Sequence, residues 1–373
     1  MAWASLDDPL HDPVSDPVRL HSVRTALLDW FSANARDLPW RRDYSPYSVW
    51  IAESMLQQTQ MQRGVAFYCR WMERFPNLAS VAFASEESIL RAWEGLGYYS
   101  RARNVHATAK ILLENFGGEF PRDLMELEKL PGIGRYTARA ICGIAFEETV
   151  ACVDANVLRI VSRIFDVPYA VDSAKGRRLI ETIATSLILK GQARATNQAM
   201  MEFGALVCGK DPLCSMCPLA TLCLACARGT VLVRPVKKRT VRRETKTVAC
   251  ALFVFDKSLL VERRTGKRIW SGLLTLPEVD VPYGSTPKAS LLSHLSAVLG
   301  VPLELGRFER SLRHAYTKWT ITLWGIALTS PSLPSNLGPY TFLSLSDLYA
   351  APLPSPHRKL IHAYQEAGAD CVR

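Results

Sequence analysis

A glycine-rich turn and a distant carboxylate are the residues whose types and spacing point most clearly to chemistry. The turn is Leu130–Gly134, with the sequence LPGIG, and Asp154 follows Gly134 by twenty residues. Such a turn between apolar helical stretches directs the N–H groups of Gly132 and Gly134 outward at a helix start, where the helix dipole also attracts an anion. The pattern predicts a site for a backbone phosphate, with the Asp154 carboxylate beside the sugar that carries it.

A second carboxylate, Glu53, interrupts the apolar helical stretch that starts at Pro46. A buried carboxyl group resists ionisation, so it can stay protonated and act as a general acid. A salt-bridged glutamate on the surface is the alternative. Three glutamines follow, at positions 57, 58 and 60. Their flat amides can wedge into a base stack and bond to base edges, or they form a solvated helix end.

Four cysteines form a C-x5-C-x2-C-x5-C cluster, namely Cys208, Cys214, Cys217 and Cys223. In a reducing cell such a cluster indicates a metal site, and not a disulfide framework. The spacing suits zinc and an iron–sulfur cluster equally well. Cys226 follows the last of the four by three residues and could stand in for it.

The segment Trp93–Asn104 combines glycines, two tyrosines and two arginines. It predicts a surface for base stacking and phosphate contacts, although a tyrosine packed in the core is the alternative.

The composition narrows the class of protein. A chain of 373 residues predicts two or three domains. The net charge of +10 and a pI near 9.2 suit a partner made of phosphates. No apolar run could span a membrane, and the acidic, proline-rich N-terminus lacks a signal core. We therefore expect an intracellular protein of the cytoplasm or nucleoid of a bacterial-type cell, monomeric and without a membrane partner.

Hydrophobic periodicity predicts a helical domain followed by an α+β domain. Residues 1–17 are expected to be a disordered leader, 18–228 the helical domain, 229–246 a basic linker and 247–373 the α+β domain. The predicted helices are Val18–Phe31, one starting at Pro46, Ser100–Phe116, Tyr136–Ala145, Asn156–Ile164, Lys175–Leu189 and Asn197–Val207. In the last domain the pattern predicts strands Val248–Phe255, Leu259–Arg263 and Trp319–Leu328, and helices Ser290–Leu299 and His357–Glu366.

Taken together, these segments resemble the adenine DNA glycosylases of the MutY family, which remove adenine mispaired with 8-oxoguanine. The resemblance runs from about Arg36 to the last helix. It implies an all-α helix-hairpin-helix glycosylase domain with its hairpin at 130–134. It also implies a [4Fe–4S] cluster loop at 208–223, held by Cys208, Cys214, Cys217 and Cys223, and an α+β Nudix-like C-terminal domain that reads 8-oxoguanine. The partner would be double-stranded DNA carrying adenine opposite 8-oxoguanine or guanine.

The resemblance also implies a role for individual residues. Glu53 would protonate the adenine and later handle the water, and Asp154 would stabilise the oxocarbenium-like sugar. Tyr136 would approach the reacting nucleotide, and Asn156 would orient the catalytic groups. The adenine pocket would be lined by Arg36, Trp40, Arg41 and Glu202. The 8-oxoguanine would meet Gln58 and Tyr98, and the recognition motif of the last domain at Tyr316, Thr317 and Lys318.

The chain departs from the family pattern in three places. The first cysteine gap holds five residues, where the family has six. Ala155 replaces the glycine of an Asp-Gly-Asn turn. Lys318 replaces the histidine of a Phe-Ser-His motif, which affects the reading of 8-oxoguanine most.

Three other functions are alternatives to adenine excision. An endonuclease III-like glycosylase/lyase needs a lysine amine at the position of Tyr136, and a phenol cannot form its Schiff base. A Nudix nucleotide hydrolase needs acidic ligands for Mg²⁺, yet Ser290–Leu299 contains no Asp or Glu. A non-catalytic DNA-binding homologue is opposed only by the presence of both Glu53 and Asp154.

Overall fold

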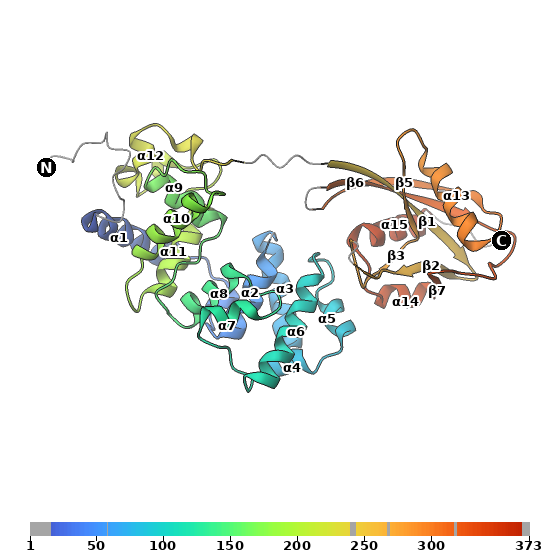
Figure 1. Ribbon diagram of the computed structural model, residues 1–373, viewed down its shortest axis with the longest axis horizontal. Helices are drawn as coiled ribbons and strands as arrows, with labels where there is room; N and C mark the ends of the chain where they lie inside the picture. The colour runs from blue at the N-terminus through green and yellow to red at the C-terminus, as the bar shows by residue number, and fades with distance from the viewer. Residues whose placement is uncertain (1–15, 58, 239–243, 267–268, 317–318, 368–373) are drawn as a thin grey trace. The chain divides into compact units, whose positions relative to one another are not determined.

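The computed structural model describes residues 16–57, 59–238, 244–266, 269–316 and 319–367 (Figure 1). The chain forms two compact units, each with its own core. The first, here called the helical unit, comprises Met1–Phe83 and Asn104–Thr240. The second, the sheet unit, comprises Ala84–Arg103 and Val241–Arg373. Nearly all of the expected leader lies outside the described residues.

The expected helices are all present, and short helices that the periodicity did not predict lie between them. They are α1 (Pro17–Asn34), α2 (Pro46–Leu56), α3 (Met61–Arg74), α4 (Leu78–Ala82), α5 (Glu86–Ala92), α6 (Ser100–Asn115), α7 (Leu124–Lys129), α8 (Arg135–Ala140), α9 (Ala155–Ile164), α10 (Ala174–Ser186), α11 (Ala193–Leu206) and α12 (Leu224–Ala227).

Local sequence signals explain where several of these helices begin. A proline opens α1 and α2, and the side chains of Asp16 and Ser45 accept hydrogen bonds from the first turns. Asp154 caps α9, because its Oδ1 accepts the Val157 N–H at 2.7 Å. The sequence therefore places this carboxylate at a fixed position, the start of a helix.

The core of the helical unit fixes the two helices that carry most of the site. Apolar side chains of α1, α9, α10 and α11 pack into one cluster, which includes Leu27, Ile160, Ile183, Met200 and Phe203. Because their apolar faces are buried there, the start of α9 and one face of α11 are held in place.

The hairpin predicted at 130–134 connects α7 to α8. Gly132 has φ +76°, and a Cβ there would lie 2.6 Å from the Asn104 Cβ, so only glycine fits. Helix α8 continues as a π-helical turn, Ile141–Ala145, where the sequence predicted plain α-helix. Gly143 lies in that turn, and a Cβ there would lie 2.8 Å from the Val150 carbonyl oxygen. The missing side chain thus lets the segment that leads to Asp154 approach closely.

The sheet unit is built on seven strands. They are β1 (Glu244–Phe255), β2 (Ser258–Arg263), β3 (Leu274–Thr275), β4 (Glu278–Asp280), β5 (Glu304–Tyr316), β6 (Trp319–Thr329) and β7 (Tyr340–Ser344). The order is β3-β2-β1-β6-β5, with β4 paired to β1 and β7 to β2. Strands β1 and β6 are parallel, and the other strand pairs of the described residues are antiparallel. The three strands that the sequence predicted are confirmed, and Asp256 and Lys257 form the turn between the first two.

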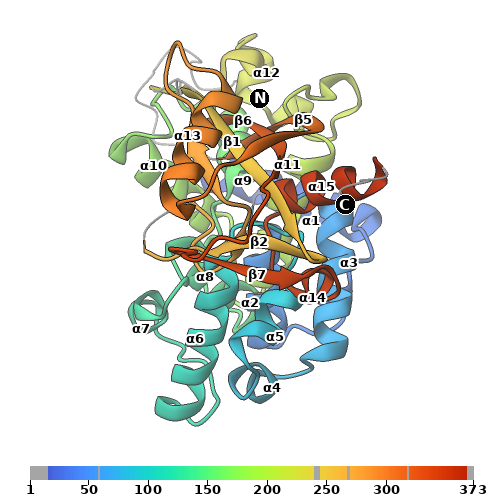
Figure 2. The ribbon, with the colours of Figure 1, turned by 90° about the vertical axis from the view of Figure 1, so that its right-hand side faces the viewer.

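Helices cover both faces of this sheet, as Figure 2 shows for α13 (Pro287–Leu299) and α15 (Ser355–Glu366). A short helix, α14 (Leu345–Ala350), follows β7. Alternate residues of β1 point to opposite faces, so Ala251 and Phe253 contact the α13 side while Cys250 and Leu252 contact the α15 side. The part of β1 from Val248 to Phe255 is therefore apolar, which is why its sequence predicts a continuous buried strand.

The basic stretch between the units is partly structured. Val236 accepts a hydrogen bond from the Val171 N–H at 2.9 Å, and the Lys238 N–H donates to Asp172. Strand β1 starts at Glu244, inside the predicted linker.

Candidate active site

A cavity of about 600 Å³ opens in the helical unit, and several elements meet at it. The turn η1 (Pro39–Arg41), helices α2, α8 and α11, and the start of α9 all contribute side chains. Its size is in the range of pockets that enclose a small organic ligand. Among the residues that line it are Arg36, Trp40, Arg41, Tyr44, Glu53, Tyr136, Asp154, Asn156, Gln198 and Glu202.

Glu53 lines the cavity from α2, and Glu53 with Tyr136 is here called the Glu53 end of the cavity. The Tyr136 hydroxyl donates a hydrogen bond of 2.7 Å to its Oε2. Burial raises the pKa of Glu53 to about 7, while the bond from Tyr136 opposes the rise and the nearby Asp154 adds to it. Burial also raises the pKa of Tyr136 well above its usual range, so the tyrosine stays a neutral donor. A carboxyl group tuned to neutral pH can hold or release a proton there.

Asp154 has a different environment, because it is held by donors. Its Oδ1 accepts the Val157 N–H at 2.7 Å, and its Oδ2 accepts the Asn156 amide at 2.8 Å. Burial raises the pKa of Asp154, and these bonds lower it. Hydrogen bonds to a carboxylate and a helix N-terminus both favour the charged form. The family's glycine is replaced here by the first residue of α9, a helical position that alanine fills without strain.

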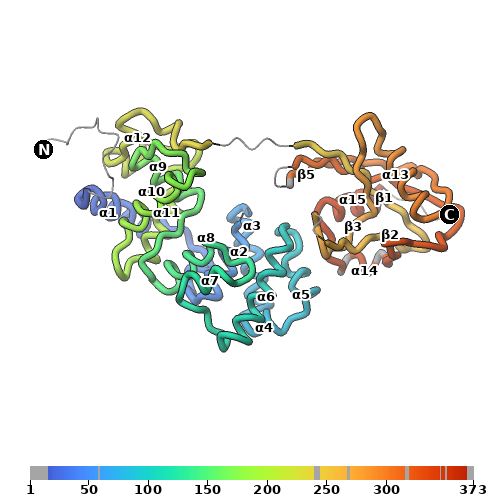
Figure 3. The backbone as a smooth tube through the Cα atoms, in the orientation of Figure 1, coloured from blue at the N-terminus to red at the C-terminus, as the bar shows by residue number. Residues whose placement is uncertain are grey.

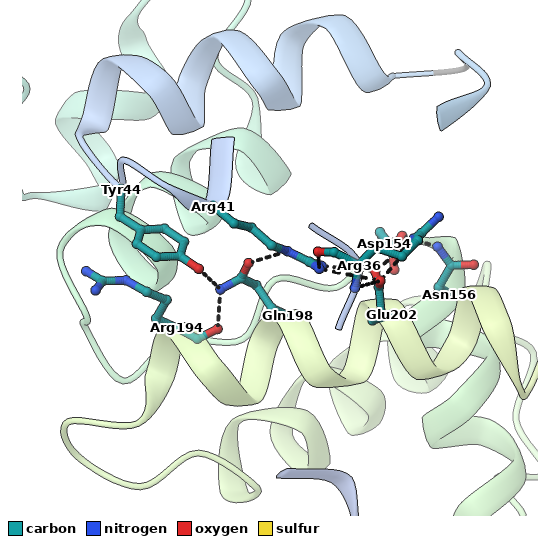
Figure 4. Close-up of polar contacts among 8 residues, drawn as sticks. All are labelled: Arg36, Arg41, Tyr44, Asp154, Asn156, Arg194, Gln198 and Glu202. Carbon is teal, nitrogen blue, oxygen red and sulfur yellow. Dashed lines mark hydrogen bonds and ion pairs between the residues drawn. The ribbon is translucent and has the colours of Figure 1, made fainter. Parts of the chain in front are cut away.

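Glu202 lines the same cavity from α11 and pairs with Arg36 and Arg41 (Figure 4), and these three residues are here called the Glu202 end of the cavity. Arg36 donates from Nε to Oε1 at 2.6 Å, and Arg41 donates from Nη2 to Oε2 at 2.9 Å. Burial alone would raise the pKa of Glu202, but the hydrogen bonds from both arginines outweigh it and lower the pKa to about 2. This carboxylate is therefore permanently charged, and the guanidinium groups are fixed in place.

Helix α11 extends this network with residues that the sequence analysis missed. Gln198 accepts from Arg41 Nε at 2.9 Å and donates to the Tyr44 hydroxyl at 3.2 Å. The Arg194 guanidinium stacks over the Tyr44 ring, 4.3 Å from its centroid. The sequence does contain a signal for these residues. Arg194, Gln198 and Glu202 are spaced by four, so a helix places their polar side chains on one face. Figure 4 shows the three side by side on α11.

The structure brings together eight of the residues that the resemblance assigned to catalysis or adenine binding. These are Arg36, Trp40, Arg41, Glu53, Tyr136, Asp154, Asn156 and Glu202. Gln58, Thr317 and Lys318 lie outside the described residues, as does the side chain of Tyr316 at the end of β5. Tyr98 belongs to the sheet unit, where it has φ +49°. The hairpin residues Gly132 and Gly134 are both exposed.

The cysteine cluster follows α11, along the path that Figure 3 traces from α11 to α12. Its four thiols and that of Cys226 line one small pocket. Polar groups surround it, since the Arg163 guanidinium lies 3.5 Å from Cys208 Sγ and the Leu219 N–H bonds to the sulfur of Cys217. Arg159 donates both to the Cys208 carbonyl and to Asn156 Oδ1, which connects this loop to the start of α9.

The sequence and its fold were compared with known proteins. Residues 51–184 match the family model of the HhH-GPD superfamily of base excision DNA repair proteins, and residues 248–363 match that of the NUDIX domain. The adenine DNA glycosylase of Buchnera aphidicola subsp. Baizongia pistaciae is 31% identical over 90% of this chain and 94% of its own length. The chain belongs to the adenine DNA glycosylase family. This family consists of base excision repair enzymes that hydrolyse N-glycosyl bonds, and the helical and Nudix-like domains expected for it are both present.

Further comparisons agree on this family and on its fold. The adenine DNA glycosylase of Mus musculus is 41% identical over 57% of this chain, and the match spans 44% of that protein, less than half its length. A thermostable thymine-DNA glycosylase of known structure superposes with a TM-score of 0.53 at 25% identity, covering 57% of this chain and 98% of its own. In the part of the chain that the structure describes, no helix is long and apolar enough to cross a membrane.

Proposed function

We propose that this member of the adenine DNA glycosylase family hydrolyses the N-glycosidic bond of adenine paired with 8-oxoguanine or guanine in duplex DNA. One observation carries the proposal. A glutamic acid with a pKa near 7 is hydrogen-bonded to Tyr136 in the same cavity as Asp154. Breaking a glycosidic bond needs one neutral acid and one charged carboxylate, and the cavity offers both.

Glu53 supplies the proton. Because burial raises its pKa to about 7, its carboxyl group can carry a proton at neutral pH and protonate the ring of the departing adenine. Once it is ionised, the same group can orient and deprotonate the water that completes hydrolysis. Tyr136 holds Oε2 of Glu53 in place throughout.

Asp154 stabilises the positive charge that develops on the sugar. The hydrogen bonds from Val157 and Asn156 fix the carboxylate and favour its charged form against burial, which raises the pKa of Asp154. A preorganised charge of this kind costs no reorganisation during the reaction.

The other end of the cavity recognises the base after it has left the duplex. Adenine presents ring-nitrogen acceptors and an exocyclic amine donor. Arg36 and Arg41 offer donors, and Gln198 and Glu202 offer oxygen acceptors, so the set is complementary to adenine. Trp40 adds an apolar wall that packs edge-on against the Tyr68 ring.

A lyase mechanism lacks its nucleophile here. Among the described residues that line the cavity none is a lysine, and Tyr136 occupies the position where the lyase has one. We therefore expect an abasic product with an intact strand.

The contacts with DNA are proposed from the family resemblance and from chemistry. Gly132 and Gly134 would bind a backbone phosphate, and Gln58 and Tyr98 would wedge beside the 8-oxoguanine. Tyr316, Thr317 and Lys318 would lie against the lesion strand. The ammonium of Lys318 cannot accept the N–H donor that distinguishes 8-oxoguanine from guanine, so discrimination is expected to be weaker than with a histidine.

Cys208, Cys214, Cys217 and Cys223 would hold a [4Fe–4S] cluster, which supplies a structural cross-link when it is bound. Four thiolates around zinc lie about 3.8 Å apart, from a Zn–S bond of about 2.3 Å. Among the described residues no three of these sulfurs lie within 4.8 Å of one another. The wider arrangement favours a cluster over a single zinc ion.

The test is a single-turnover excision assay on duplexes with adenine opposite 8-oxoguanine, guanine, cytosine and thymine. We expect excision opposite 8-oxoguanine and guanine, and no covalent adduct after borohydride treatment. Equal rates on all four duplexes would contradict the proposed mismatch, and a rapidly trapped stoichiometric adduct would contradict the monofunctional mechanism.

A further inference from the structure

The cysteine pocket holds one thiol more than the four that a cluster needs. Cys208, Cys214, Cys217, Cys223 and Cys226 all line it, and none of the five is in a disulfide. The fifth, Cys226, lies on α12, which starts directly after Cys223. Its position within the pocket needs an explanation, because one cluster cannot use five thiolates at once.

Cys226 is tied to two of the other four cysteines. Its side chain is hydrogen-bonded to the thiol of Cys214, and its backbone N–H donates to the sulfur of Cys223. Both Cys214 and Cys226 are partly exposed. The thiol of Cys226 therefore lies next to one particular ligand position, that of Cys214.

The two elements that carry these thiols are short. Cys214 starts a 3-10 turn of three residues, and Cys226 belongs to a helix of four. Short elements of this kind can shift more easily than the long helices α9 and α11 that carry the rest of the site. Because the two thiols are hydrogen-bonded to each other, a shift of these short elements would move the Cys226 sulfur toward the position of Cys214.

We propose that Cys226 is a ligand-competent spare thiol, which replaces Cys214 when the bond between iron and the Cys214 sulfur breaks. This inference rests on the cluster put forward under the proposed function. In the exchange one iron–thiolate bond to Cys214 breaks and one to Cys226 forms. The Cys226 thiol gives up its proton to solvent, and the released Cys214 thiolate takes one up. No oxidant or reductant is needed.

The structure predicts an asymmetry between two single substitutions. Cys214→Ala removes the sulfur that Cys226 contacts, so the cluster should survive, with at least half of the wild-type iron. Cys217→Ala is the matched control, because the hydrogen bond from the Cys226 side chain singles out Cys214. It should lose iron at least tenfold, as should the double variant Cys214→Ala/Cys226→Ala.

The experiment measures iron per chain and visible absorbance of the full-length protein, purified without oxygen. Roughly four irons are expected in the wild type and in Cys226→Ala. A wild type without iron would refute the cluster itself. A wild type with iron, together with equal losses in Cys214→Ala and Cys217→Ala, would refute only the spare ligand.

A second measurement needs no change at a ligand position, in case Cys214→Ala does not fold. The wild type and Cys226→Ala are exposed to an iron chelator, and the rate of iron release is recorded for each. The spare thiol should recapture iron, so Cys226→Ala is expected to release it several-fold faster. Equal rates would overturn the proposal. Cys142→Ala serves as the control, because Cys142 is a buried cysteine outside the pocket.

Discussion

Glu53 and Glu202 line the same cavity, yet their carboxyl groups are held in opposite states. Burial raises the pKa of Glu53 to about 7, and the group that bonds to it is the neutral phenol of Tyr136. Glu202 is also buried, but two guanidinium groups lower its pKa to about 2. The cost of desolvation acts on both residues, so the difference comes from the partner that each one has.

The contrast explains how one pocket can hold and react with adenine. The end at Glu202 has fixed charges that do not change near neutral pH, which suits recognition. The end at Glu53 can gain or lose a proton near neutral pH, which suits catalysis. Substitutions at the Glu53 end should therefore act on catalysis, and substitutions at the Glu202 end on adenine recognition.

The largest effect is expected from Glu53→Gln. The amide keeps the shape of the side chain but cannot protonate the departing base, so excision should fall by at least ~100-fold. Single-turnover rates on a duplex with adenine opposite 8-oxoguanine measure it, with the exposed Glu119→Gln as the control. Binding of the same duplex should stay within a few-fold of the wild type, since the groups that contact phosphate are unchanged. Near-normal excision would show that Glu53 is not the acid.

Asp154→Asn is expected to reduce excision by about 100-fold, because it removes the charge that faces the cationic sugar. The asparagine oxygen can still accept the Val157 N–H, so the start of α9 should be preserved. Circular dichroism checks the fold, and the exposed Asp29→Asn is the control. A variant that is inactive and unfolded would point to a capping role alone.

At the other end of the cavity, Glu202→Gln should act on stability as well as on adenine binding. It leaves Arg36 and Arg41 without their charged partner, at a cost of about 3 kcal/mol in unfolding free energy. Asp166→Asn is a matched control, because Asp166 is also buried and pairs with two arginines, and neither Asp166 nor those arginines line the cavity. Both variants should lose stability, and only Glu202→Gln should also lower excision, by about tenfold. Equal effects on excision would deny Glu202 a place in recognition.

Local sequence signals predicted part of the Glu53 end. Asp154 precedes a predicted helix and Glu53 interrupts an apolar stretch, but periodicity left a salt-bridged surface position for Glu53 open, and its burial depends on the packing of α2. The recognition end was only partly predictable from the chain itself. Gln198 and Tyr44 are separated by 153 intervening residues and meet only because α11 packs beside the segment before α2.

The sheet unit shows the same limit. The apolar strands β1, β2 and β6 were predicted, because they lie in the middle of the sheet and read as continuous or alternating apolar runs. Strand β5 was missed. It lies at the sheet edge with much of its surface exposed, and its residues Glu304–Tyr316 carry charges throughout. Its existence depends on pairing with β6, which local pattern does not encode.

The opposite pKa shifts predict opposite dependences on pH. Excision should fall about tenfold per pH unit once the pH rises past about 7, as Glu53 loses its proton. For stability, the contribution of Glu53 is full below its ordinary pKa of 4.5 and is lost as pH rises through about 7. That of Glu202 is full above 4.5 and is lost as pH falls through about 2. As the pH rises from 4.5 to about 7, the Glu53→Gln variant should therefore lose less stability than the wild type. Melting temperatures across this range measure it, and parallel curves would contradict the assigned shift.

The smallest effect is expected from Tyr136→Phe, and it sharpens the comparison most. The tyrosine hydrogen bond lowers the pKa of Glu53, so removing the hydroxyl should raise that pKa further. At pH 7 more of the acid is then protonated, while the carboxyl group is held less firmly, and the net change in excision should stay below about tenfold. The decisive readout is the pH at which excision falls, which should move upward. Tyr44→Phe is the control, because it removes a hydroxyl from the Glu202 end of the same cavity and should leave that pH unchanged. A downward shift in Tyr136→Phe would mean that the phenol supports the neutral form of Glu53, and that burial alone does not set its pKa.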